Sequence, residues 1–222
     1  MTSGADERVS AVDAVLFDLD GTLIDTIELI LTSFRHATGA VLGEPLPDRL
    51  LLENIGVPLS RQMRQFAPDH AEELVRVYRE HNAAHHDEIA REYPGVHEAL
   101  DAIAATGRPM GVVTSKGSPM AHHGLAVFGL SHYFPVVVTA DDVEVHKPDP
   151  FPLCHAATRL GVPIERCAYV GDSPYDMAAA LAGGALAIAA LWGAFSAEEL
   201  LAPGPHHALA SISELPELLG RV

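Results

Sequence analysis

The chain has 222 residues, 48% hydrophobic and 20% charged, which is enough apolar material for one large domain or for one domain that carries an insertion. This composition excludes a disordered chain and a low-complexity fibre. The formal net charge of −16 gives a surface that repels phosphate backbones and anionic lipids. We therefore expect neither nucleic acid nor a membrane as a partner.

The chain also lacks the sequence signals of secreted and membrane proteins. Its two cysteines, Cys154 and Cys167, are too few for a disulfide scaffold. Apolar runs are shorter than the roughly 18 residues that a membrane-spanning helix needs, and the longest candidate, 178–195, is interrupted by glycines. Residues 1–10 carry two acids and no long apolar stretch, unlike a signal peptide. We expect a cytoplasmic protein.

In chain order, the first predicted element is a strand buried on both faces, over 11–19, because a short apolar run there is too short for a helix. Residues 26–93 then show helical patterns with short breaks at glycine and proline, and no run typical of a buried strand. We predict a helical insert over 26–93 and a core domain formed by 1–25 and 94–222.

Helices and strands alternate in the rest of the chain. Val96, Ala99, Leu100 and Ile103 follow the i, i+3, i+4, i+7 spacing of a helix over 96–105. Further helices are predicted over 118–128, 151–160 and 175–181, strands over 110–113, 136–139, 167–170 and 185–190, and a turn over 203–207. This alternation predicts an α/β fold with a Rossmann-like, mostly parallel sheet and helices on both faces, whose functional residues lie at the carboxyl ends of the strands.

The end of the first predicted strand carries two carboxylates. Asp18 and Asp20 are two residues apart, so they begin on the same face of the strand. Two like charges this close are unfavourable unless a cation neutralises them or one stays protonated, and Mg²⁺ prefers carboxylate, water and phosphate oxygens. A solvated turn is the alternative interpretation of these two residues alone.

The next strand ends add complementary groups. The second predicted strand is followed by the hydroxyls of Thr114 and Ser115. The third is followed by Lys147, in a loop that also holds prolines and acids, and the fourth by Asp172 and Asp176, near the N-terminus of a helix. A hydroxyl, a loop N–H and a lysine suit an anion, whereas clustered carboxylates suit a divalent metal. Four successive strand ends therefore predict one phosphate-handling site.

This ordered set resembles the haloacid dehalogenase-like hydrolase superfamily. The motifs are the sequence DLDGT at 18–22, then Thr114, then Lys147, and Gly-Asp-Ser at 171–173 with Asp176. The helical insert falls where the phosphatase branch of that family places its small helical C1 cap. Segments 20–30, 82–88 and 136–150 make the chain most similar to phosphoglycolate phosphatases and to the pyrophosphatase type PpaX.

The resemblance implies a role for each core residue. Asp18 is expected to be the nucleophile that forms an aspartyl-phosphate, and Asp20 the general acid and then the general base. Mg²⁺ is expected to be held by Asp18, the backbone carbonyl of Asp20, and Asp172, with Asp176 behind them or acting through water. The groups expected to bind the transferring phosphoryl oxygens are Thr114, Ser115 and Lys147.

The cap is expected to choose the substrate, because the core binds only the phosphoryl group. Its predicted substrate-binding residues are Arg61 and His85, with Asn82 and His86 as further candidates. The predicted substrate is a small phosphorylated metabolite, such as phosphoglycolate, or pyrophosphate. Hinges near 25–26 and 93–95 are expected to let the cap open and close.

Two alternatives remain open at this point. Phosphomutases of the β-phosphoglucomutase type resemble this chain at Asp25 and Thr26, but they carry a cap-hinge histidine where this chain has Ile30. A phosphoryl-accepting signalling module also combines Asp, Thr or Ser, and Lys at strand ends. Such a module lacks both an acid like Asp20 and a long helical insert, so we favour a phosphatase.

Overall fold

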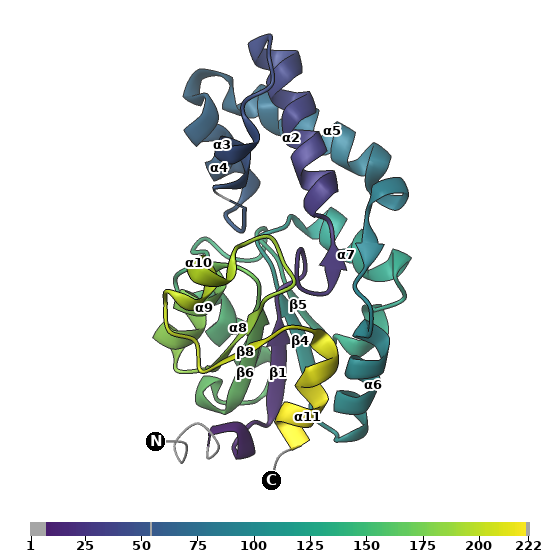
Figure 1. Ribbon diagram of the computed structural model, residues 1–222, viewed down its shortest axis with the longest axis vertical. Coiled ribbons are helices and arrows are strands. Elements are labelled where there is room, and N and C mark those ends of the chain that lie inside the picture. Colours follow the sequence, from purple (N-terminus) through teal and green to yellow (C-terminus); the bar gives the residue numbers. More distant parts are fainter. Residues whose placement is uncertain (1–7, 54, 221–222) are drawn as a thin grey trace.

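The computed structural model describes residues 8–53 and 55–220. Its centre is a parallel sheet of six strands in the order β5-β4-β1-β6-β7-β8, with the helices of residues 27–89 gathered beyond one end of the sheet (Figure 1). The sheet strands are β1 (Ala14–Phe17), β4 (Met110–Val113), β5 (Val136–Val138), β6 (Cys167–Gly171), β7 (Leu186–Ala190) and β8 (His207–Leu209).

The central strands are buried on both faces, which explains why their sequences are continuous apolar runs. Every residue of β1, β4, β6 and β7 is buried. β1 lies between β4 and β6, pairing Phe17 with Val112 on one side and with Val170 on the other. The predicted α/β fold with a mostly parallel sheet is confirmed.

Helices cover both faces of the sheet and separate its core into two layers. One layer contains side chains of α6 (Val96–Ala105), α7 (Ser118–Val127) and α11 (Leu215–Gly220). The other contains side chains of α8 (Phe151–Leu160), α9 (Pro174–Gly183) and α10 (Ala197–Leu201). Short 3₁₀ helices complete the connections: η1 (Pro68–His70), η2 (Ser131–Tyr133), η3 (Ile164–Arg166) and η4 (Ile212–Glu214).

The α-helices between β1 and α6 form their own small core. They are α2 (Ile27–Leu42), α3 (Asp48–Leu52), α4 (Leu59–Phe66) and α5 (Ala71–Ile89). Phe34, Met63 and Leu74 are buried together at its centre. The chain enters these helices through β2 (Ile24–Asp25) and leaves through β3 (Arg91–Glu92), which pair antiparallel. We refer to residues 27–53 and 55–89 as the cap and to the other described residues as the core.

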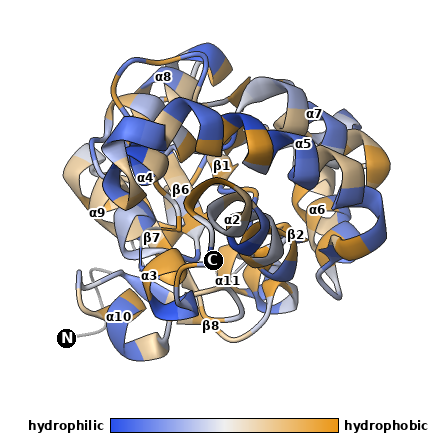
Figure 2. Ribbon diagram, turned by 90° about the horizontal axis from the view of Figure 1, so that it is seen from above, coloured by the Kyte–Doolittle hydropathy of each residue, from blue (hydrophilic) through white to orange (hydrophobic). Residues whose placement is uncertain are grey.

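Polar contacts join the cap to the core next to this ladder. His86 and Asp87 lie near the end of α5, and His123 lies on α7. A carboxylate oxygen of Asp87, Oδ1, is 2.9 Å from Nδ1 of His86 and 2.7 Å from Nε2 of His123. Seen from above, α5 and α7 lie beside each other and α2 lies over the sheet (Figure 2). These contacts fix the place of the cap above the carboxyl ends of the strands.

Two short stretches of strand differ from the sequence-based expectation. Residues 203–207 were expected to form a turn, but His207 begins β8, because its backbone pairs with that of Ile188 at the sheet edge. β3 lies inside the range expected to be helical, where two residues with no apolar pattern pair with β2. None of the described helices is both long and apolar enough to span a membrane.

Candidate active site

Asp18 lies immediately beyond β1, at the centre of the sheet's carboxyl edge. Its backbone N–H donates to the carbonyl of Val170 on β6, at 2.9 Å, and the residue is only 5% exposed. Burial raises the pKa of this carboxyl to about 7; the charge of Lys147 opposes this shift, and Asp176 adds to it. The Oδ1 atom of Asp18 lies 3.1 Å from Nζ of Lys147, so the position of the carboxylate depends on this one cation.

Lys147 is 2% exposed and reaches the sheet from the loop between β5 and α8. Its ammonium donates to Oδ1 of Asp176 at 2.6 Å, to the hydroxyl of Tyr169 at 2.9 Å and to the carbonyl of Val113 at 3.2 Å. Burial alone would lower the pKa of Lys147, but Asp176 and Asp18 raise it above its usual value. The lysine therefore stays charged within the core.

Asp172, just beyond β6, sits between two glycines. A Cβ atom on either Gly21 or Gly193 would collide with its carboxylate, so only glycine allows this close packing. The hydroxyl of Thr22 donates to Oδ1 at 3.3 Å, and the backbone N–H of Ala194 donates to Oδ2 at 2.9 Å. Burial, reinforced by the neighbouring acids, raises the pKa of Asp172 well above its usual value.

Asp176 is fully buried in the first turn of α9 and already has partners for both carboxylate oxygens. Oδ2 accepts from the backbone N–H of Ser173 at 3.0 Å and from its hydroxyl at 2.6 Å, and the Asp176 N–H donates back to that hydroxyl. This reciprocal pair is a capping box. Oδ1 accepts from Lys147 and Tyr169. Asp176 therefore fixes Lys147 in place.

Together these residues fit a divalent metal ion. Ligand atoms of Asp18, Asp172 and Asp176 all lie within 4.8 Å of one another, and the three buried carboxylates face a single lysine. Among the described residues, Oδ1 of Asp18 has the Lys147 ammonium 3.1 Å away but no aligned hydrogen bond, so this oxygen can still accept a cation. Oxygen ligands of this type suit Mg²⁺. Asp18 and Asp172 line the cavity whereas Asp176 does not, so Asp18 and Asp172 are the carboxylates that an ion in the cavity can reach.

Asp20 lies beside this cluster but is held by different partners. Nζ of Lys116 donates to both of its carboxylate oxygens, at 2.9 and 3.0 Å, and the hydroxyl of Thr26 donates to Oδ1 at 2.7 Å. Lys116 follows β4, and Thr26 precedes α2. Asp20 is thus supported from the core and from the base of the cap.

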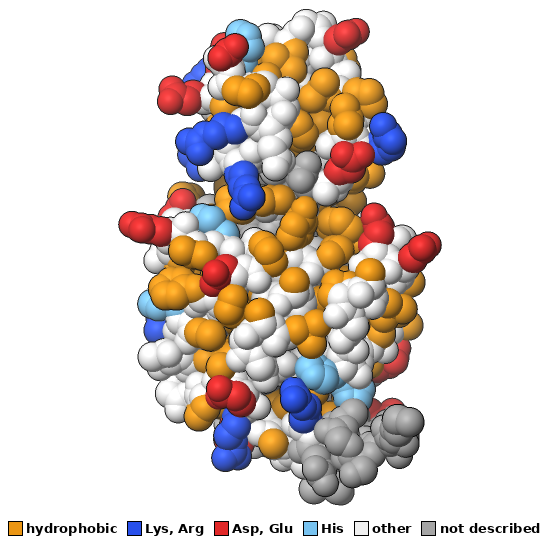
Figure 3. Space-filling model, turned by 90° about the vertical axis from the view of Figure 1, so that its left-hand side faces the viewer, with side chains coloured by type: hydrophobic (Ala, Val, Ile, Leu, Met, Phe, Trp, Pro, Cys, Tyr) orange, Lys and Arg blue, Asp and Glu red, His pale blue; other side chains and the backbone are white. Residues whose placement is uncertain are grey.

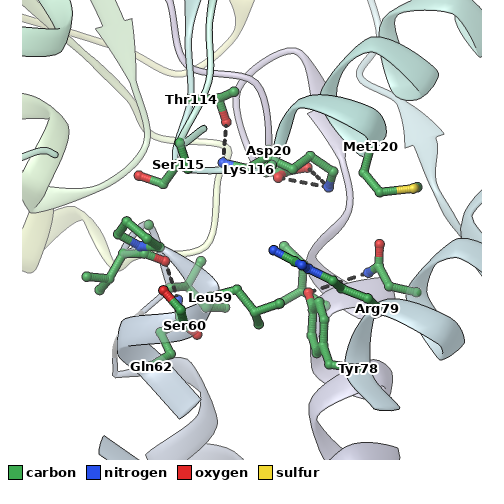
Figure 4. Close-up of a pocket in the computed structure, with 18 of the residues that line it drawn as sticks. Asp20, Leu59, Ser60, Gln62, Tyr78, Arg79, Thr114, Ser115, Lys116 and Met120 are labelled. Carbon is green, nitrogen blue, oxygen red and sulfur yellow. Dashed lines mark hydrogen bonds and ion pairs between the residues drawn. The ribbon is translucent and has the colours of Figure 1, made fainter. Parts of the chain in front are cut away.

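Thr114 and Ser115 follow β4 on the same edge of the sheet (Figure 4). The Thr114 N–H donates to the carbonyl of Val138 at 2.9 Å, and its hydroxyl accepts from the Lys116 N–H at 3.1 Å. The Ser115 hydroxyl is buried and has no hydrogen-bond partner in the described parts of the chain.

A cavity of about 470 Å³ lies between these residues and the cap. Figure 3 shows the two lobes with a narrow waist between them, and Figure 4 shows side chains of both lobes facing each other. Its core-side wall includes Asp18, Asp20, Thr114, Ser115, Lys116 and Asp172. On the cap side, Arg79 of α5 extends toward Asp20 and Lys116 (Figure 4). The structure thus brings the core residues predicted from the sequence to one cavity, with Lys147 and Asp176 directly behind it.

The two cap residues predicted to bind substrate, Arg61 and His85, do not line the cavity. Arg61 is exposed on α4, and the cavity is lined by its neighbours Ser60 and Gln62 instead. The His85 ring stacks on that of His81 at 4.2 Å, and it does not line the cavity. The roles of Arg61 and His85 in substrate binding stay predictions.

Among the two further cap candidates, Asn82 lines the cavity and His86 is buried without lining it. Arg79, which the sequence reasoning missed, lies three residues before Asn82. It therefore shares a helix face with Asn82. The three-residue spacing from Asn82 was the sequence signal that could have identified Arg79 as a cavity residue.

Comparison with known proteins now identifies the family. The family model described as haloacid dehalogenase-like hydrolase matches residues 15–190. The chain belongs to this family. It is 41% identical over 166 residues to pyrophosphatase PpaX of Halalkalibacterium halodurans, covering 75% of this chain and 77% of that protein. It is 36% identical over 215 residues to pyrophosphatase PpaX of Bacillus velezensis, covering 97% and 98%.

A solved structure agrees with the fold of this haloacid dehalogenase-like hydrolase. A hydrolase from Pseudomonas syringae superposes with a TM-score of 0.84 at 26% identity, over 92% of this chain and 96% of that one. The match with the family model spans the strand ends that carry Asp18, Thr114, Lys147 and Asp172. The chain is an enzyme of the phosphatase type within this family.

Proposed function

We propose that this protein is a Mg²⁺-dependent phosphatase that hydrolyses a small phosphorylated metabolite through an aspartyl-phosphate on Asp18. The observation that carries the proposal is the position of the Asp18 carboxylate. It lies 3.1 Å from the ammonium of Lys147, borders the cavity, and has Asp172 and Asp20 beside it. A nucleophile, an acid, a cation and a metal-binding pair of carboxylates thus meet at one point.

In the first step, a carboxylate oxygen of Asp18 attacks phosphorus, and the bond between phosphorus and the leaving-group oxygen breaks. Asp20, in its protonated form, gives its proton to that oxygen. In the second step, Asp20 accepts a proton from water, whose oxygen attacks the aspartyl-phosphate and releases phosphate. Lys116 and Thr26 hold Asp20 in position for both transfers.

Mg²⁺, when bound by Asp18 and Asp172, supplies positive charge that offsets the repulsion between an anionic nucleophile and an anionic phosphate. Lys147 adds a fixed positive charge beside Asp18 and favours its ionised form. Thr114 and Ser115 line the cavity, and we assign the Thr114 hydroxyl and the Ser115 N–H to the binding of phosphoryl oxygens. In the cap we assign substrate contact first to Arg79, which lines the cavity, and only after it to Arg61 and His85, the residues that the sequence predicts.

The substrate and the setting are also part of the proposal. Relatives that span most of this chain are named pyrophosphatase PpaX, which makes pyrophosphate the first candidate and phosphoglycolate the second. We further propose that residues 26–93 form a cap domain, that 1–25 and 94–222 form the core domain, and that the protein works in the cytoplasm.

The structure favours hydrolysis over the mutase alternative at one residue. Ile30 lines the cavity and is 8% exposed. An apolar side chain at this position cannot exchange protons as a histidine can. A phosphoryl-accepting signalling module would not need a cavity between a cap and Asp20, so the cavity argues against the signalling alternative.

Turnover of p-nitrophenyl phosphate with Mg²⁺ tests the proposal. Wild-type protein is expected to release p-nitrophenol, and Asp18→Asn is expected to lose at least about 10³-fold in kcat, because the nucleophile is removed. Asp13→Asn is the matched control, since Asp13 pairs with Arg166 just before β1, outside the cavity. Undiminished turnover in Asp18→Asn would refute the proposal.

A further inference from the structure

The cap side of the cavity is mostly apolar. Side chains from α2, from the loop before α4, from α4 itself and from α5 contribute to it: Ile30, Phe34, Ile55, Val57, Pro58, Leu59, Tyr78 and Ala83. Met120 and Pro119 of α7 extend this surface from the core. We call these ten residues the apolar wall. In Figure 4, Leu59 and Met120 approach the cavity from opposite lobes, below and beside Asp20.

The polar groups on the cap side are largely committed to the protein itself. Nε2 of Gln62 donates to the carbonyl of Val57 at 2.7 Å and so fixes the loop before α4. Nδ2 of Asn82 lies 3.4 Å from the hydroxyl oxygens of Ser33 and Tyr78. Among the described cap residues that line the cavity, Arg79 carries the only charge.

These walls are a poor match for an inorganic substrate. A pyrophosphate ion transfers one phosphoryl group and leaves a second multiply charged phosphate facing the cap, which burial against apolar side chains would penalise. On the core side, Lys116 is already paired with Asp20. The other basic residues that line the cavity are Arg79 and His146, and burial lowers the pKa of the His146 imidazole, so Arg79 is the main charge facing that leaving group. The volume of about 470 Å³ lies instead in the range of cavities that bind organic ligands.

We propose that the preferred substrate is a phosphate monoester of a mid-sized organic alcohol, whose apolar face packs on the apolar wall. This inference rests on the proposed phosphatase chemistry, and it ranks an organic ester above pyrophosphate, the candidate that the names of the relatives suggest. The phosphoryl group passes to Asp18, the ester P–O bond breaks, and the alcohol oxygen takes the proton of Asp20. The organic part remains between Leu59 and Met120, with Arg79 beside it for an acceptor group on the same alcohol.

The test compares kcat/KM for benzyl phosphate, ethyl phosphate and pyrophosphate, each with Mg²⁺. Both esters release primary alcohols, so their ratio chiefly reports the contact made by the ring. We expect benzyl phosphate to exceed ethyl phosphate by about tenfold or more, since burying a ring is favourable, and to exceed pyrophosphate as well. In Leu59→Asn and in Met120→Gln, the benzyl-to-ethyl ratio should fall by about fivefold.

Leu50→Asn is the control for a polar substitution in the cap, because Leu50 is exposed on α3 and does not line the cavity. Its benzyl-to-ethyl ratio should equal that of the wild type. A ratio near one in the wild type, or Asp18-dependent turnover that is fastest with pyrophosphate, would overturn this inference and leave the proposed function standing. Failure to hydrolyse any of these compounds or p-nitrophenyl phosphate would overturn both.

Discussion

Lys147 and Asp176 form a buried ion pair, with Nζ 2.6 Å from Oδ1. The chain contains just two lysines, Lys116 and Lys147, and each pairs with a carboxylate from the end of β1: Lys116 with Asp20 and Lys147 with Asp18. In a protein with a net charge of −16, both lysine ammonium groups therefore lie in one site. The site concentrates, at this edge of the sheet, positive charge that is rare in the rest of the chain.

Removal of the buried lysine tests how much Lys147 contributes to the stability of the fold. Lys147→Met leaves Asp18 and Asp176 without their cation, so the free energy of unfolding in EDTA should fall by about 3–5 kcal/mol. Urea denaturation followed by circular dichroism measures this. Arg166→Met breaks an exposed pair with Asp13 and should cost less than about 1 kcal/mol. Equal losses in the two variants would contradict the role given to Lys147.

The raised pKa of Asp18, about 7, predicts how the metal-free protein responds to pH. Between about pH 4 and 7, the unfolded chain ionises this carboxyl while the folded chain keeps it protonated, so stability falls as pH rises. Asp18→Asn removes this loss, and in EDTA at pH 8 the variant should be more stable than the wild type by a few kcal/mol. Thermal denaturation from pH 5 to 8 checks this. A steeper decline in the variant would contradict it.

The glycines around Asp172 predict a variant that spares the acids but weakens metal binding. In Gly193→Ala the new Cβ displaces the Asp172 carboxylate, so the Kd for Mg²⁺ should rise about 10- to 100-fold. Trp192, the single tryptophan, donates to the carbonyl of Thr22 at 3.0 Å, and its fluorescence can follow the titration. Gly39→Ala in α2 meets only ordinary contacts and should leave the Kd unchanged. An unchanged Kd in Gly193→Ala would show that Asp172 does not hold the ion.

Two arginines of the cap can be told apart by the charge of the substrate. Arg79 lines the cavity and Arg61 does not, so Arg79→Met should lower kcat/KM for phosphoglycolate about tenfold more than for ethyl phosphate, which lacks the carboxylate. The same comparison in Arg61→Met should show less than a threefold difference. The reverse order would favour Arg61, the residue that the sequence predicts.

The core part of the site could be predicted because its residues are tied to strand ends. Apolar runs mark β1, β4 and β6, and parallel strands place their carboxyl ends at one edge of the sheet. Asp18, Thr114 and Asp172 therefore meet near one another although the chain separates them widely. The predicted helix bounds 96–105 and 151–160 also agree with α6 and α8.

The cap could be predicted as helical but not oriented from the sequence. Which face of α5 meets the cavity depends on how α5 packs on α2 and α7. His85 and Arg79 lie on the same helix, yet only Arg79 lines the cavity. β8 was missed for a related reason: a three-residue edge strand gains its pairing from β7 and not from an apolar pattern of its own.

The most direct test of the nucleophilic role of Asp18 uses Asp20→Asn, which removes the base for the second step. p-Nitrophenolate leaves without a proton donor, so the first step should persist while dephosphorylation slows. We predict a burst of one equivalent of p-nitrophenol, and mass spectrometry of the acid-quenched protein should find one phosphoryl group on the peptide that contains Asp18. A steady release without a burst, together with an unmodified Asp18 peptide, would contradict the aspartyl-phosphate mechanism.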